Sequence, residues 1–129
     1  MKILFFVHAD EGRIAQVISN LLSNAVKFTE EGSITVKMKK EKDDNAISHE
    51  LIVVSIRDTG EGIDPDVKDK LFEKFETKSK KGIGLGLYIS RKIIEAHDGR
   101  IWAENNSDGK GATFAFSLPT NKKTTSYSS

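Results

Sequence analysis

The chain has 129 residues, of which 37% are hydrophobic and 30% charged, and this suits one domain of ordinary size. Its 20 Lys and Arg against 19 Asp and Glu give a net charge of +1, which argues against a dedicated nucleic-acid binder. The absence of cysteine excludes a disulfide framework, a thiolate zinc site and a catalytic cysteine. The apolar runs are too short for membrane insertion and no secretory cleavage site follows the first one, so we expect a cytoplasmic domain.

Apolar spacing predicts the elements of the first half of the chain. Asp10 is a favourable N-cap, and Ile14, Ile18 and Leu21 recur at helical spacing after it. In chain order, the pattern predicts a strand over 3–7, a helix over 11–28, a strand with one wet face over 34–38, a polar loop over 39–48 and a central strand over 51–58.

The second half continues with a short helix from Pro65 to about Phe72, which begins where proline is tolerated. A second long helix follows from Leu85 to Ala96, ended by Gly99. Strands over 101–104 and 112–118 are joined by a turn over 106–109, which makes a hairpin. We therefore expect an α+β sandwich over residues 1–119, with helices on one face of a mixed, mostly antiparallel sheet, and a flexible tail over 120–129.

Three polar residues share one stripe of the first helix beside its apolar face. Asn20, Asn24 and Lys27 stand at i, i+4 and i+7, so they can point together into a cleft at the edge of the sheet. Amide oxygens suit Mg²⁺ and a lysine ammonium suits phosphate. An ordinary polar helix face explains the same residues, and on their own that reading is the commoner one.

Asp58 ends the central strand and begins the stretch Asp58-Thr-Gly60-Glu-Gly62. Alternation puts its carboxylate on the apolar face of the strand, where it needs a hydrogen-bond donor. The exocyclic amine of adenine is one such donor, and the glycines let backbone approach a ligand closely. The simpler alternative is an aspartate at a strand end followed by a glycine turn.

The second glycine-rich stretch is Gly82-Ile-Gly84-Leu-Gly86-Leu, directly before a helix. Backbone N–H groups at such a helix start attract anions, and Lys78, Lys80 and Lys81 precede it. The stretch lacks the Gly-Lys-Ser/Thr ending of a P-loop and no strand leads directly into it, so neither a P-loop nor a Rossmann fingerprint is present.

Together and in this order, the three stretches resemble the catalytic ATP-binding domain of sensor histidine kinases, within the GHKL superfamily. Asn20 to Thr29 resembles its N-box, Asp58 to Gly62 its first glycine box, Leu71 to Phe75 its F-box, and 82–87 its second glycine box. The resemblance covers about residues 3–119. It implies a Bergerat-type fold that binds ATP or ADP with Mg²⁺.

The resemblance also implies roles for individual residues. Asn24 would be the main Mg²⁺ ligand with Asn20 nearby, Lys27 would meet phosphate, and these three are the catalytic candidates. Asp58 would contact the adenine amine directly and through a water that lies close to Thr113. The remaining nucleotide contacts implied are Phe28, Gly60, Gly62, Ile63, Lys81, Gly82, Gly84, Leu85 and Gly86.

The resemblance also implies a difference from the hydrolysing members of the superfamily. The position that matches Asn20 is a Glu in those members, and this Glu acts as a base on water. A neutral amide cannot take that proton, so we expect phosphoryl transfer to an external nucleophile. None of His8, His49 and His97 fits the acceptor motif. The acceptor would belong to a separate dimerisation domain, with a response regulator downstream, and the isolated chain would be a monomer that autophosphorylates poorly. The alternative is a regulatory nucleotide-binding module or an anti-sigma-type serine kinase.

Overall fold

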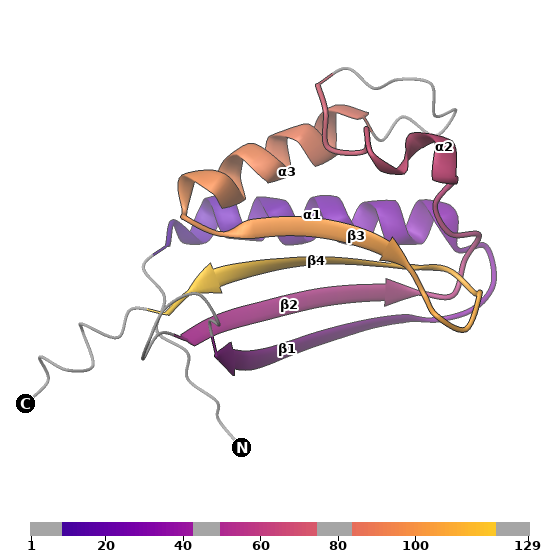
Figure 1. Cartoon of the computed structure of the whole chain (residues 1–129), viewed down its shortest axis with the longest axis horizontal. Helices are drawn as coiled ribbons and strands as arrows, with labels where there is room; N and C mark the ends of the chain where they lie inside the picture. The colour runs from indigo at the N-terminus through magenta and orange to yellow at the C-terminus, as the bar shows by residue number, and fades with distance from the viewer. Residues whose placement is uncertain (1–8, 43–49, 75–83, 121–129) are drawn as a thin grey trace, which may run out of the picture.

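The computed structural model describes residues 9–42, 50–74 and 84–120. Its elements are α1 (Glu11–Phe28), β1 (Ile34–Lys42), β2 (Glu50–Asp58), α2 (Pro65–Lys68), α3 (Gly84–Ala96), β3 (Arg100–Asn105) and β4 (Ala112–Pro119). The strands form one sheet in the order β1-β2-β4-β3, with the helices on one side of it (Figure 1). This confirms the two-layer α+β sandwich. Every pairing within these ranges is antiparallel, and the strand predicted over 3–7 lies outside them.

Helix α1 has the bounds that the sequence predicts. The Asp10 carboxylate caps it by accepting a hydrogen bond from the Arg13 N–H at 3.2 Å. Val17 and Leu21, at 0% and 1% exposure, face the sheet. Burying each such side chain contributes about 1.5–3 kcal/mol, so this apolar stripe fixes which side of α1 faces the core.

Strands β2 and β4 form the centre of the sheet. Ile52, Val54 and Ile56 alternate along β2, and the latter two stand opposite Phe116 and Phe114 of β4. Asp58 continues the same alternation and is therefore carried into the end of the core, where it is 3% exposed.

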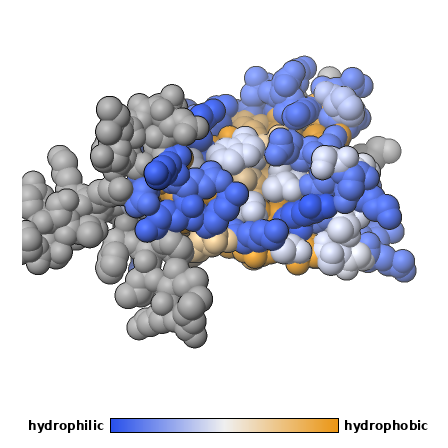
Figure 2. Space-filling model, turned by 60° about the horizontal axis from the view of Figure 1, so that its bottom comes forward, coloured by the Kyte–Doolittle hydropathy of each residue, from blue (hydrophilic) through white to orange (hydrophobic). Residues whose placement is uncertain are grey.

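Strand β1 differs from its prediction in two ways. It continues to Lys42 instead of becoming a loop at 39, because its backbone pairs with β2 as far as Lys42 opposite Glu50. The face of β1 that was expected to be buried is also exposed: the side chains of Val36 and Met38 are 51% and 54% exposed. The helices pack on β2, β3 and β4, so the inner side of this edge strand stays uncovered. Seen from the β1 side, hydrophilic residues dominate the surface and apolar ones show between them (Figure 2).

The ends of the other helices also depart from expectation. Helix α2 ends at Lys68, and hydrogen-bonded turns continue the chain to Glu73 where a helix to about Phe72 was expected. After α3, Asp98 takes the left-handed conformation at φ 62°, and the Gly99 N–H closes the end on the Ile94 carbonyl. Within ranges 9–42, 50–74 and 84–120, no helix has the length and apolarity that a membrane crossing requires.

Candidate nucleotide site

The Asp58 carboxylate is held by the backbone around it. Its Oδ1 accepts hydrogen bonds from the Gly60 N–H at 2.9 Å and the Ala112 N–H at 3.2 Å. These bonds offset much of the cost of burying the charge. A carboxylate has two oxygens with about four acceptor positions. The hydrogen bonds described here use only Oδ1, so Oδ2 remains for a donor on a ligand.

The first glycine box passes tightly against the end of α1. A Cβ on Gly60 would lie 2.0 Å from the Phe28 carbonyl oxygen, which also accepts a hydrogen bond from the Glu61 N–H at 3.2 Å. Gly62 has φ 83°, a conformation that other residues rarely adopt. Gly60 is therefore required by helix packing, while the resemblance had assigned it to the base.

An apolar pocket of about 470 Å³ lies beside this loop. Its walls come from the end of α1, the glycine box, the α2 region and β4; the lining residues are Phe28, Glu61, Gly62, Ile63, Asp64, Pro65, Val67, Leu71, Ala112 and Phe114. Ala112 also donates to the Asp58 carboxylate, so a buried acceptor stands next to the pocket wall. A flat apolar ring with an amine at its edge matches this combination.

The sequence predicted three of these lining residues, Phe28, Gly62 and Ile63. It did not single out Ala112 or Phe114 as pocket residues, because their part in the wall depends on how β4 pairs with β2. Phe114 also packs edge-to-face on Phe72, with ring centroids 6.3 Å apart, and this contact joins β4 to the segment after α2.

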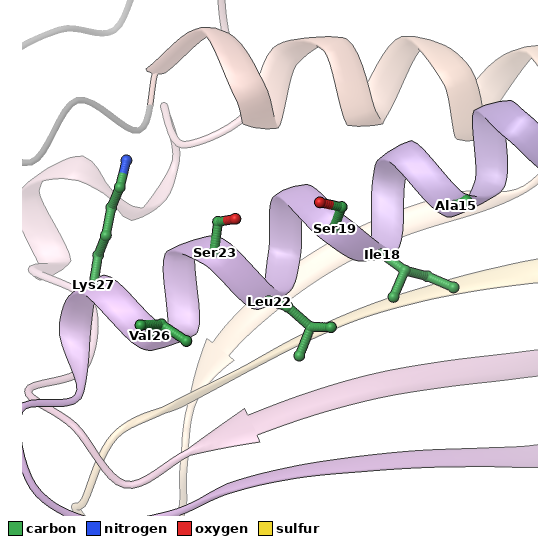
Figure 3. Close-up of a pocket in the computed structure, with 7 residues that line it drawn as sticks. All are labelled: Ala15, Ile18, Ser19, Leu22, Ser23, Val26 and Lys27. Carbon is green, nitrogen blue, oxygen red and sulfur yellow. The ribbon is translucent and has the colours of Figure 1, made fainter.

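The polar stripe of α1 points toward the beginning of α3. Asn20 donates through Nδ2 to the Gly86 carbonyl at 3.3 Å and to the Ser90 hydroxyl at 3.1 Å. Asn24, one turn later, is 6% exposed. The Lys27 side chain reaches toward the side on which α3 begins, whereas Ile18 and Leu22 point toward the strands (Figure 3).

A larger groove of about 660 Å³ runs along α1 (Figure 3). Its lining residues are Ala15, Ile18, Ser19, Leu22, Ser23, Val26 and Lys27. Of the predicted site residues, only Lys27 lines this groove. None of the lining residues is a buried carboxylate such as Asp58. The smaller pocket is the one that lies beside the Asp58 carboxylate, through its lining residue Ala112.

The second glycine box contributes the first turn of α3. Gly84, Leu85 and Gly86 lie in this turn, so its backbone N–H groups stand at a helix start, where anions are favoured. The predicted contacts Lys81 and Gly82 lie outside the described residues, as does Phe75 of the F-box.

The donor set suits a hard cation held mainly by neutral oxygens. No group of three His, Cys, Asp or Glu that could hold a metal occurs in the described part of the chain. Because Asn20 uses Nδ2 toward α3, its Oδ1 is the atom left for a cation. Amide oxygens of Asn20 and Asn24 together with phosphate oxygens would form an oxygen set that Mg²⁺ accepts.

The structure does not bring Thr113 together with the Asp58 side chain. Thr113 pairs with Arg57, so its side chain lies on the helix-free face of the sheet, opposite to Asp58. Its hydroxyl donates to Asn106 Oδ1 at 2.6 Å. This corrects the expectation that Thr113 lies near the adenine contact; Ala112 occupies the position beside Asp58 instead.

His97 joins the end of α3 to the start of α1. Its Nδ1 lies 2.8 Å from the Ile93 carbonyl oxygen, and its Nε2 accepts a hydrogen bond from the Asp10 N–H at 3.0 Å. The ring therefore bridges the two helices through one hydrogen bond at each nitrogen.

Comparison with known proteins decides the family. A model of the family described as "Histidine kinase-, DNA gyrase B-, and HSP90-like ATPase" matches residues 9–122, which is most of the chain. The chain belongs to this family. The N-box and the glycine boxes that suggested it are therefore interpreted as parts of a histidine kinase-type ATPase domain.

The similar curated proteins are sensor kinases. The chain is 46% identical over 118 residues to the adaptive-response sensory kinase SasA of Gloeothece citriformis, covering 88% of the chain and 28% of that protein. It is 44% identical over 116 residues to the sensor protein FixL of Bradyrhizobium diazoefficiens, covering 88% and 22%. The chain thus spans about a quarter of the length of these relatives.

Solved structures of histidine kinases share the fold. Full-length ShkA in complex with AMPPNP matches with a TM-score of 0.73 and 35% identity, over 91% of this chain and 23% of that one. The catalytic domain of histidine kinase ThkA matches with a TM-score of 0.69 and 39% identity, over 88% and 70%. The chain therefore corresponds to the ATP-binding catalytic domain of a sensor histidine kinase.

Proposed function

We propose that this domain binds Mg-ATP with the adenine in the pocket beside Asp58 and the phosphates between the polar stripe of α1 and the start of α3. The observation that carries this proposal is the buried Asp58 carboxylate next to an apolar pocket of about 470 Å³, where it accepts a hydrogen bond from the lining residue Ala112. The likeness to a kinase solved with AMPPNP supports it. Phe28 and Ile63 would contact the base, and Lys27 would meet a phosphate.

The proposed reaction is transfer of the γ-phosphoryl group to a histidine of a separate dimerisation domain, in the same or a partner protein. The sensor kinases among the relatives support this choice over a regulatory module or a serine kinase. Phosphoryl transfer depends mainly on positioning and on charge stabilisation. Asn20 and Asn24 would hold the cation and Lys27 would stabilise phosphate charge; when bound, Mg²⁺ offsets the negative charge on the phosphates.

Asn20 makes hydrolysis an unfavourable side reaction in this proposal. Its amide has no basic atom that could take a proton from water, and its Nδ2 is already committed to Gly86 and Ser90. Bound ATP would therefore persist until an acceptor histidine docks. A response regulator would receive the phosphoryl group afterwards, and the domain would work in the cytoplasm.

The test combines binding with transfer. Titration of the purified chain with ATP should show tighter binding with Mg²⁺ than with EDTA. Addition of a dimerisation domain carrying an acceptor histidine should yield acid-labile phosphohistidine, and a His→Gln acceptor is the control. Phosphoserine on a partner, or bound ATP without any transfer to the matching acceptor, would overturn the histidine kinase assignment.

A further inference from the structure

Two consecutive asparagines, the last residue of β3 and the one after it, hold the segments around the candidate base pocket. Asn105 accepts a hydrogen bond from the Ile63 N–H through Oδ1 at 2.7 Å and donates from Nδ2 to the Ile63 carbonyl at 3.0 Å. One side-chain amide thus satisfies both backbone groups of one residue, as a neighbouring strand would. That residue, Ile63, lines the pocket.

Asn106 fixes the other side of the same region. Its Nδ2 donates to the Asp58 carbonyl at 2.8 Å and to the Lys110 carbonyl at 2.7 Å, and its Oδ1 accepts from Thr113. It is 9% exposed, so these bonds form in a largely dry environment. Asn106 therefore belongs to the folded frame of the hairpin, and its removal would disturb the fold.

Asn105 differs from Asn106 because its side chain is exposed and belongs to no part of the hydrophobic core. Removing it opens no cavity and leaves no buried group of its own unpaired. What it does hold is the glycine box: Gly62 directly precedes Ile63, and a Cβ on Gly62 would lie 2.9 Å from Asn105 Oδ1. The Asn105 side-chain amide is therefore in close contact with the loop at both Gly62 and Ile63.

We propose that Asn105 is a positioning residue for the base pocket, which fixes the Gly62–Ile63 backbone and so sets affinity for the adenine ring but not for the phosphates. The inference rests on the proposed function for the identity of the ligand. The contact between Asn105 and Ile63 does not depend on the proposed function, because the two hydrogen bonds exist without nucleotide. Asn105 makes no direct contact with ATP in this proposal.

The variants separate the two bonds. Asn105→Ala removes both. Asn105→Asp keeps an oxygen for the Ile63 N–H but sets a carboxylate against the Ile63 carbonyl, so it should fail to restore the wild-type loop. Ser107→Ala, an exposed substitution in the neighbouring turn, is the matched control. All four proteins should fold, and the two Asn105 variants should melt a few degrees below the wild type and Ser107→Ala, because they lose partly buried hydrogen bonds to Ile63.

The measurements separate base from phosphates. Loss of these bonds should weaken ATP and adenosine binding by about three- to tenfold, while binding of Mg-tripolyphosphate stays as in the wild type. In the nucleotide-free protein, hydrogen exchange at the Ile63 amide should accelerate in Asn105→Ala and not in Ser107→Ala.

Unchanged exchange at Ile63, unchanged ATP affinity, or equal losses for adenosine and tripolyphosphate would each overturn the proposal. A wild-type chain that binds no ATP would instead contradict the proposed function. The exchange experiment on the free protein would then still decide whether Asn105 holds the loop.

Discussion

Substitution of Asp58 separates the fold from ligand binding. Asp58→Ala removes the acceptor of two backbone N–H groups, the partly buried one of Gly60 and the buried one of Ala112. Each unsatisfied buried donor costs about 1–3 kcal/mol, so the variant should lose about 2–6 kcal/mol of unfolding free energy. Domains of this size are stable by about 5–15 kcal/mol, so it should fold but melt many degrees earlier.

Asp58→Asn is the sharper variant. The Asn oxygen can accept the same two N–H bonds, so stability should fall by far less than in Asp58→Ala. Its second atom becomes an NH₂ donor, which cannot accept a hydrogen bond from the adenine amine. Losing that bond costs about 1–3 kcal/mol of binding, so the dissociation constant for ATP should rise about fivefold to 150-fold.

Thermal unfolding and calorimetric titration with Mg-ATP provide the assay for both variants. The Asn variant should be close to wild type in melting temperature and far from it in affinity. ATP affinity equal to wild type in Asp58→Asn would refute the assignment of the base pocket. A fully stable Asp58→Ala would refute the account of how the carboxylate is held.

Three further predictions concern the cation, the glycine box and the helix link. Asn24→Ala should abolish the difference between ATP affinities measured with Mg²⁺ and with EDTA; a persisting difference would place the cation elsewhere. Gly60→Ala should destabilise by about 3 kcal/mol or more, because its Cβ would overlap the Phe28 carbonyl at 2.0 Å. The control Gly12→Ala lies in the first turn of α1, where its Cβ would make only an ordinary contact with the Asp10 carboxylate at 3.5 Å, so it should stabilise by up to about 0.5–1 kcal/mol in the same denaturant titration. His97→Ala should lower the unfolding free energy by about 0.5–1.5 kcal/mol and expose the Asp10 amide to exchange, and retained protection there would contradict the link.

Local patterns were enough to predict α1 and the central strands. The Asp10 cap and the 3.6-residue spacing fix both ends of α1, and alternation fixes which residues of β2 face the core. The end of β1 was missed because residues 39–42 are polar on both faces. They form a strand only because β2 offers its backbone to pair with.

The sequence singled out candidate residues that belong to a motif on one element, such as Asn20 and Asp58, and their roles toward a nucleotide stay predictions. It did not single out residues that carry no motif and contact a distant segment. Asn105 meets Ile63 across 42 positions, and nothing in either local sequence marks that pair. The face of Thr113 likewise follows from the register of β4 on β2, which the sequence of β4 alone does not contain.

The amide of Asn20 also restricts how this domain can change its chemistry. It donates hydrogen to the Gly86 carbonyl, so a carboxylate in its place would confront that oxygen with like charge and repel the first turn of α3. Converting the domain from a phosphoryl donor into an ATP hydrolase would therefore require α3 to move as well as residue 20 to change. A single substitution at this position should give a weaker binder before it gives a hydrolase.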